Sequence, residues 1–141
     1  MVSDQARSWV LPSDPTAAFH ARRHVEASCS GLPEDCVDIA CLLATELVSN
    51  AVRHGRGTVV LAIARDGSEV RVDVSDESPE LPVVTEGDVM REHGAGLRLV
   101  DALASSWGTQ VLHEPRPGKR VWFALAGAGG AEQARARGEV G

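Results

Sequence analysis

Residues 58–75 read Thr58-Val-Val-Leu-Ala-Ile-Ala-Arg65-Asp66-Gly67-Ser68-Glu-Val-Arg-Val-Asp-Val-Ser75, and this stretch decides the fold. Two runs rich in β-branched residues flank an Asp-Gly pair, which is the pattern of a β-hairpin with a tight turn. In the second run Val70, Val72 and Val74 alternate with polar residues, so we expect one face of that strand to be buried. The stretch therefore predicts an antiparallel hairpin with one face on the core.

Helical patterns lie on both sides of this hairpin. Apolar residues recur at helical spacing, and prolines precede two of the runs where a first helical turn tolerates them. The expected elements are a strand at residues 8–11, helices at 15–28, 33–54 and 96–107, and a last hairpin that pairs 109–113 with 120–125. Because strands and helices do not alternate regularly, we expect an α+β fold, a two-layer α/β sandwich. Its sheet should be mixed but mostly antiparallel, with about three helices on one face.

Composition and length indicate one domain. The chain has 141 residues, of which 43% are hydrophobic and 24% charged, and these values are ordinary for a globular protein. We expect a single domain over residues 1–126, a disordered glycine- and alanine-rich tail over 127–141, and a long mobile loop over 77–93. No run of apolar residues is long enough to span a membrane, and the start lacks a secretory signal, so we expect a cytoplasmic protein with reduced thiols.

The charge and the cysteines exclude several kinds of function. A formal net charge of −6 argues against direct binding to nucleic acid, which normally needs a basic patch. The three cysteines lack a C-x-x-C pair, so neither a disulfide framework nor a zinc site is indicated. We expect all three to be small buried or half-buried residues.

Glu46 and Asn50 lie four residues apart on the second expected helix, and Arg53 and His54 continue the same surface. A carboxylate and an amide oxygen on one helix face can orient a hydroxyl group and hold a magnesium ion. A solvated polar face is the alternative, and the pair alone does not distinguish the two.

Asp76 follows the three buried valines in parity, so its carboxylate should point towards the core side of the sheet. A buried carboxylate needs a hydrogen-bond donor. That donor could be the amino group of a ligand, or a protein group in the turn formed by residues 76–79.

Gly94-Ala95-Gly96 comes immediately before the third expected helix, where free backbone N–H groups and the helix dipole favour a phosphate. The loop does not match a P-loop, because no Gly-Lys-Ser/Thr follows it. It does not match the dinucleotide fingerprint either, because no strand precedes it. A flexible hinge is the alternative.

The order of these segments resembles the GHKL, or histidine-kinase-like, ATPase superfamily. The matching motifs are Glu46-Leu-Val-Ser-Asn50-Ala-Val-Arg-His54-Gly55, then Asp76-Glu-Ser-Pro79, then Gly94-Ala-Gly-Leu97-Arg-Leu-Val-Asp101. More narrowly the chain resembles the standalone anti-sigma-factor serine/threonine kinases. The resemblance spans about residues 15–125.

The resemblance implies roles for the residues of these motifs. Glu46 would be the catalytic base, Asn50 the magnesium ligand, and Asp76 the acceptor for the adenine amino group. The remaining nucleotide-binding positions would be Arg53, His54, Gly94, Ala95, Gly96 and Leu97, with residues 80–93 as a lid over the phosphates.

The function implied is ATP- and Mg2+-dependent phosphoryl transfer to a serine or threonine of a STAS-domain anti-sigma antagonist, with ADP as the product. The alternative is a non-catalytic module that sequesters a sigma factor or another regulator when nucleotide binds. No membrane partner is expected, and a homodimer stays open. Two departures from the family pattern bear on nucleotide affinity: Glu77-Ser78-Pro79 replaces the usual glycines, and Arg120 stands where many relatives have threonine.

Overall fold

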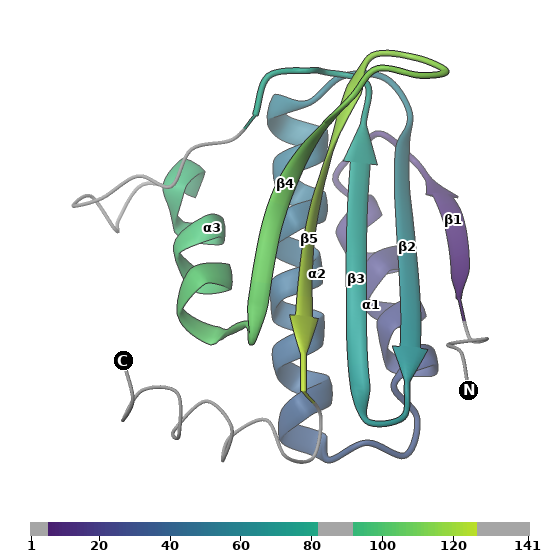
Figure 1. The fold of residues 1–141 in the computed structure, drawn as a ribbon, viewed down its shortest axis with the longest axis vertical. Coiled ribbons are helices and arrows are strands. Elements are labelled where there is room, and N and C mark those ends of the chain that lie inside the picture. Colours follow the sequence, from purple (N-terminus) through teal and green to yellow (C-terminus); the bar gives the residue numbers. More distant parts are fainter. Residues whose placement is uncertain (1–5, 82–91, 127–141) are drawn as a thin grey trace.

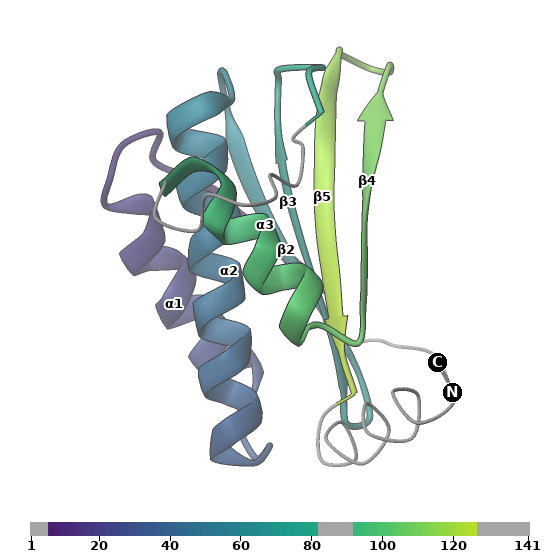
Figure 2. The same cartoon turned by 90° about the vertical axis from the view of Figure 1, so that its left-hand side faces the viewer.

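The computed structural model describes residues 6–81 and 92–126. These residues form two layers, and Figure 2 shows the helices packed on one face of the sheet. The elements are strand β1 (Arg7–Leu11), helices α1 (Ala17–Ser28) and α2 (Glu34–His54), strands β2 (Val59–Asp66) and β3 (Glu69–Asp76), helix α3 (Glu92–Leu103), and strands β4 (Ser106–Leu112) and β5 (Gly118–Leu125).

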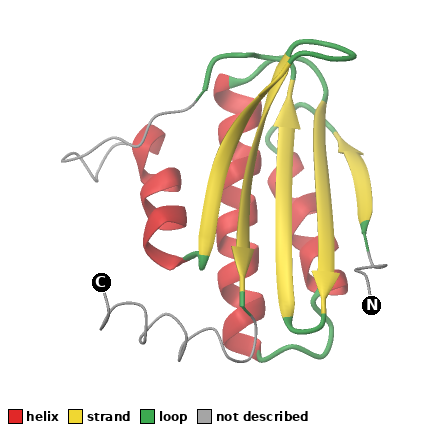
Figure 3. Ribbon diagram, in the orientation of Figure 1, coloured by secondary structure: helices red, strands yellow, loops and turns green. Residues whose placement is uncertain are grey.

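The strands follow the order β1-β2-β3-β5-β4 (Figures 1 and 3). Every neighbouring pair is antiparallel, so the described strands contain none of the parallel pairs that a mixed sheet would need. The predicted hairpin is confirmed: Asp66 pairs with Glu69 across a turn in which Gly67 has a φ of 65°. The expectation of an α+β two-layer fold is likewise confirmed.

The core lies between the sheet and the helices. Val70, Val72 and Val74 are at most 3% exposed, as their alternation predicted. Their neighbours across the sheet, among them Leu61 on β2 and Phe123 on β5, are also buried. Burying a large apolar side chain contributes roughly 1.5–3 kcal/mol each, so this face of the sheet supplies much of the driving force for folding.

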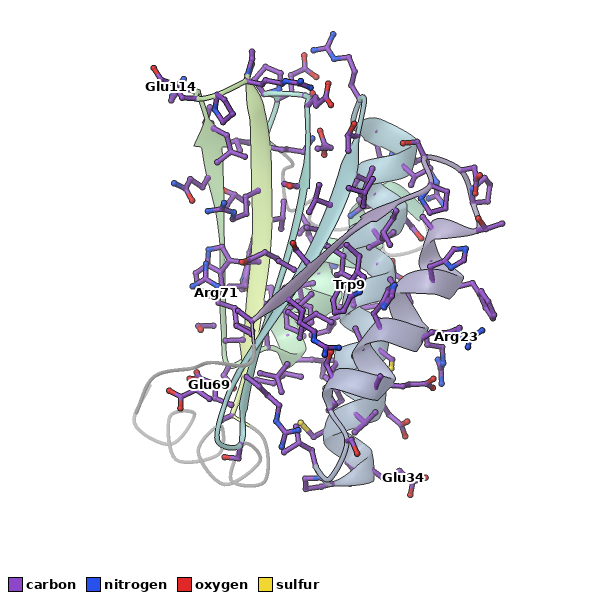
Figure 4. All side chains as sticks on the ribbon, turned by 90° about the vertical axis from the view of Figure 1, so that its right-hand side faces the viewer. Trp9, Arg23, Glu34, Glu69, Arg71 and Glu114 are labelled. Carbon is purple, nitrogen blue, oxygen red and sulfur yellow. The ribbon has the colours of Figure 1, made fainter. Side chains whose placement is uncertain are left out.

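The two faces of the sheet differ sharply. Figure 4 shows Trp9 between β1 and the helical layer, where its ring stacks on that of His24 with centroids 4.1 Å apart. Arg71 projects from the opposite face, with its guanidinium 4.2 Å from the centre of the Trp122 ring. No described helix covers this second face.

The two N-terminal helices begin and end close to their predicted bounds. Helix α2 carries Glu34 and Asp35 in its first turn and Arg53 and His54 in its last, as the helix dipole favours. Helix α1 begins two residues later than Pro15, the predicted first residue.

The prediction for the third helix was wrong at both ends. Helix α3 begins at Glu92 and ends at Leu103, whereas Trp107 and Gly108 belong to strand β4. Trp107 pairs with Phe123 on β5, and its indole N–H donates to Asp101 Oδ1 at 2.9 Å. Helical spacing placed Trp107 on the apolar side of the helix, but pairing with β5 satisfies the backbone of residues 106–112 instead.

Two predictions fall on residues that the structure does not describe. The lid expected over residues 80–93 lies mostly within 82–91, and the tail is 127–141. In the described parts of the chain, no helix combines the length and the apolar character that crossing a membrane requires.

Candidate functional site

Three elements bring the candidate site residues to one end of the molecule. Helix α2 ends, strand β3 ends and strand β5 begins at the upper end in Figure 1. Asp76 is the last residue of β3 and pairs in register with Lys119 on β5. The antiparallel pairing of β3 with β5 therefore sets a carboxylate beside an ammonium group at this end of the sheet.

Asp76 is buried, as its parity predicted, and its side chain is only 2% exposed. Lys119, whose side chain is 8% exposed, places its Nζ atom 3.0 Å from Oδ1 and 2.9 Å from Oδ2 of Asp76. The backbone N–H of Ser78 donates to Oδ1 at 2.7 Å. The sequence left open whether the donor to Asp76 is a ligand amino group or a protein group in the turn at residues 76–79. The Ser78 N–H is such a turn donor. The Lys119 ammonium group is a second protein donor, which the sequence did not predict.

Gly55 explains how closely the end of α2 approaches this carboxylate. A Cβ atom at residue 55 would lie 2.5 Å from both Cγ and Oδ2 of Asp76, and 2.4 Å from the backbone oxygen of Ala51. Real Cβ atoms do not approach other atoms so closely, so a side chain at this position would displace the carboxylate. The glycine that ends α2 therefore also makes room for the site.

The turn after Asp76 is held by its own side chains. Glu77 accepts a hydrogen bond from the backbone N–H of Thr58 at 3.0 Å, and this bond holds the pKa of the carboxyl below its usual range. The Ser78 residue is buried, and its hydroxyl accepts a hydrogen bond from the backbone N–H of Glu80 at 3.4 Å. The Glu77-Ser78-Pro79 departure from the family pattern thus forms an ordered turn that donates to Asp76.

Glu46 and Asn50 lie one turn apart on α2, and both are half-buried. They flank the buried stripe of the helix, which includes Leu43 and Leu47. Neither side chain is fully solvated, and the neighbouring Thr45 and Ser49 on the same helix have the same intermediate exposure. A carboxylate and an amide in this position can bind a polar ligand between them.

Arg53 and His54 are exposed at the end of α2. Arg53 lines an open pocket of about 280 Å³ between the start of α1 and the end of α2. The pocket is lined by Asp14, Pro15, Ala18, Ser49, Val52 and Arg53. This lining includes none of Glu46, Asn50 and Asp76. Arg53 follows Asn50 by three residues on α2, so the two are neighbours along the helix surface.

Gly94, Ala95 and Gly96 were predicted to form a loop ahead of the third helix, and this prediction was wrong. The backbone is helical from Glu92 onwards, so the three residues lie within the first turns of α3. The Leu97 side chain is 2% exposed and belongs to the hydrophobic core. Any contact of Leu97 with a phosphate would therefore come from its backbone.

Lys119 is the residue of this site that sequence reasoning missed. Its parity on β5 matches that of Val121, Phe123 and Leu125, whose side chains are all buried. The same argument that placed Asp76 on the core side would have placed Lys119 there. Arg120 has the opposite parity and donates to Gln110 Oε1 at 3.0 Å, so the basic residue that faces Asp76 is Lys119.

Comparison with known proteins assigns the family. Residues 11–125 match the family model of the histidine kinase-like ATPase domain. The chain shares its fold with the crystal structure of the RsbU and RsbW domains of Rv1364c from Mycobacterium tuberculosis, at a TM-score of 0.64 and 22% identity. That match covers 86% of this chain and 32% of the other, so this chain spans about a third of its length. No curated protein sequence matches. With the family model covering most of its length, the chain belongs to the histidine kinase-like ATPase family.

Proposed function

We propose that this chain is a cytoplasmic, ATP-dependent serine/threonine kinase that acts on a STAS-type anti-sigma-factor antagonist. The observation that carries the proposal is the position of Asp76, a buried carboxylate packed against the end of the helix that bears Glu46 and Asn50. Family membership supports the nucleotide-binding part. The choice of substrate rests on the resemblance to anti-sigma-factor kinases.

The residues present fit a nucleotide and a magnesium ion. Oδ2 of Asp76 accepts one hydrogen bond, from Lys119, and so retains capacity for a donor on a base. No three acidic, histidine or cysteine side chains gather as a metal cage in the part of the chain that the structure describes. Magnesium would therefore depend on the amide oxygen of Asn50, water and the phosphates, a ligand set that this ion accepts. When bound, it neutralises charge on the transferring group.

Glu46 is the proposed base. A carboxylate at hydrogen-bond reach of the substrate hydroxyl accepts its proton as the oxygen attacks, and such assistance contributes typically 10²–10⁴-fold to a rate. Half-burial on α2 lets Glu46 meet a bound hydroxyl while it stays accessible to a partner protein. Asn50, one turn further along the same face, would hold the metal beside it.

The test separates binding from transfer. Purified protein is mixed with Mg-ATP labelled on the terminal phosphate and with candidate STAS proteins, and transfer and ATP affinity are measured. We expect Glu46→Gln to keep ATP affinity within about threefold but to lose roughly 100-fold or more in transfer rate. Glu34→Gln, an exposed acid at the other end of α2, is the matched control and should change neither quantity.

Asp76→Asn should weaken ATP binding by at least about tenfold, because it replaces the charged acceptor for the base. Normal ATP affinity in that variant would remove the site assignment. If the wild-type chain binds ATP, transfers phosphate to no partner and captures a sigma factor, the kinase proposal fails. The chain is then the nucleotide-gated binding module that is the alternative.

A further inference from the structure

The open pocket between the start of α1 and the end of α2 lies beside the candidate site. Its volume is about 280 Å³, near the lower limit for a site that encloses a whole small molecule. Pro15, Ala18 and Val52 supply apolar wall, and its polar residues include Ser49 and Arg53. A pocket of this size and composition suits one aliphatic side chain with a polar group next to it.

The pocket is next to Glu46 on the surface of α2. Successive residues of an α-helix are about 100° apart around its axis, so Arg53, seven residues after Glu46, lies only about 20° from it. Ser49 lies about 60° from Glu46 on the same side as Arg53, and Asn50 lies about 40° away on the other side. Each residue rises about 1.5 Å, so Ser49 and Arg53 lie about 5–10 Å along the axis from Glu46. The proposed base therefore stands between the proposed metal ligand and the pocket.

The charged groups at the pocket favour an acidic partner. Asp14 Oδ1 already accepts hydrogen bonds from the backbone N–H of Thr16, at 2.8 Å, and from the hydroxyl of the same residue. A guanidinium has five N–H donors in a fork that fits a carboxylate, so Arg53 can bind an acidic group in addition to its contacts within the chain. His54 and Arg56, both exposed, follow it at the end of α2. This end of the helix is thus locally basic on a chain whose formal net charge is −6.

Exposed apolar side chains on the same two helices favour a protein as the occupant. Phe19, next to Ala18 on α1, is 59% exposed, and Leu42, one turn before Glu46 on α2, is 39% exposed. Covering such side chains with a partner is favourable, because it removes apolar surface from water. A small molecule in the pocket would leave Leu42 in water, whereas a protein that delivers a hydroxyl group to Glu46 would cover it.

We propose that the pocket is a docking subsite for the protein substrate, which inserts an aliphatic side chain between α1 and α2 and pairs an acidic side chain with Arg53. The inference rests on the proposed phosphoryl transfer and adds to it how the substrate is recognised. An extended chain advances about 3.3 Å per residue, so the aliphatic side chain should stand about two or three residues from the acceptor serine or threonine. Ala18, Ser49 and Arg53 hold the substrate and take no part in the transfer itself.

Filling the pocket tests this inference. Ala18→Leu places an aliphatic side chain in the pocket, and transfer from labelled Mg-ATP is measured at increasing concentrations of the STAS protein that the wild type phosphorylates. KM for that protein should rise by at least about tenfold, because its own aliphatic side chain is no longer buried, while kcat and the dissociation constant for ATP stay within about twofold. Ala27→Leu makes the same change at an exposed position of α1 outside the pocket and should leave KM unchanged.

Two further variants keep the test decisive. Ser49→Leu fills the pocket from α2 and is used if Ala18→Leu unfolds, which a melting curve establishes; it should raise KM likewise. Arg53→Gln should raise KM by at least about threefold and make KM less sensitive to salt, because salt screens an ion pair at an exposed arginine. Arg23→Gln changes an exposed arginine of α1 that does not line the pocket, and should alter neither KM nor its response to salt.

The outcomes separate this inference from the function on which it rests. If the wild type binds ATP but phosphorylates no STAS protein, the proposed function fails and the docking subsite fails with it. If transfer occurs, depends on Glu46 and keeps its KM in every pocket variant, only the docking subsite is overturned. If the pocket-filling variants weaken ATP binding as much as they raise KM, the pocket belongs to the nucleotide site, and the docking role is again overturned.

Discussion

Replacing Lys119 with methionine isolates the energy of the buried ion pair. The substitution keeps much of the side-chain length and leaves Asp76, 2% exposed, with the Ser78 N–H as its recorded donor among the described residues. Removing one partner of a buried pair costs about 3–5 kcal/mol, because the other charge stays buried without compensation. Since the Ser78 hydrogen bond remains, we expect the lower end, about 3 kcal/mol.

Urea denaturation followed by circular dichroism measures this cost. With an m value of about 2 kcal/mol per molar urea, a loss of about 3 kcal/mol lowers the midpoint by about 1.5 M. The double variant Asp76→Leu with Lys119→Met should recover to within about 1 kcal/mol of the wild type, since a well-packed apolar pair can replace a buried ion pair at little cost. Arg120→Met, the matched control on the open face, should change stability by less than about 0.5 kcal/mol. A loss below about 1 kcal/mol in Lys119→Met would refute the view that Asp76 is a desolvated charge.

Three further predictions concern other parts of the fold. Gly55→Ala should lower stability by about 1–3 kcal/mol, because its Cβ clashes with Asp76, and it should also weaken ATP binding. Gly67→Ala, strained at a φ of 65° in the distant hairpin turn, should lower stability without changing ATP binding. Calorimetry measures the unfolding and the ATP affinity of both variants. Burial, with the nearby His20 and Arg23 charges, lowers the pKa of His24 from its ordinary 6.5, so the folded chain prefers the neutral ring. The unfolded chain then binds a proton before the folded chain does, and stability should be lost as the pH falls from about 6.5 towards the folded pKa. Melting temperatures measured between pH 8 and pH 5 should fall less in His24→Phe, and an equal fall would contradict this account. Burial raises the pKa of the Cys29 thiol to about 11, and Cys36 and Cys41 are also buried, so Ellman's reagent at pH 8 should label all three thiols only after denaturation; rapid labelling of the native chain would count against it.

Local patterns in the sequence were enough to predict the hairpin and the two N-terminal helices. Alternation placed Val70, Val72 and Val74 on the core face, and the same parity placed Asp76 among buried groups, which the structure confirms. Local chemistry decides these features. The register and the turn are set by residues within the same short stretch.

The partner of Asp76 could not be predicted in the same way. Lys119 lies 43 residues further along the chain and becomes a neighbour only because β5 inserts between β3 and β4. Strand order depends on the summed packing of the whole sheet, which no local pattern encodes. Trp107 was wrongly predicted to be helical because its position fits the apolar spacing of the third helix. In the structure it pairs with Phe123 on β5, a long-range contact that overrides the local pattern.

The two halves of the candidate site are held by different forces, and this difference bears on how the proposed activity could be lost. Hydrogen bonds from Ser78 and Lys119 fix Asp76 in a buried position, so changes there affect stability and binding together. Glu46 and Asn50 are positioned by helix α2, whose buried stripe packs independently of their polar atoms. Exchanging Glu46 for an amide therefore leaves the core intact. If the proposed function holds, a single substitution at Glu46 therefore abolishes phosphoryl transfer while the fold and the buried Asp76 stay in place.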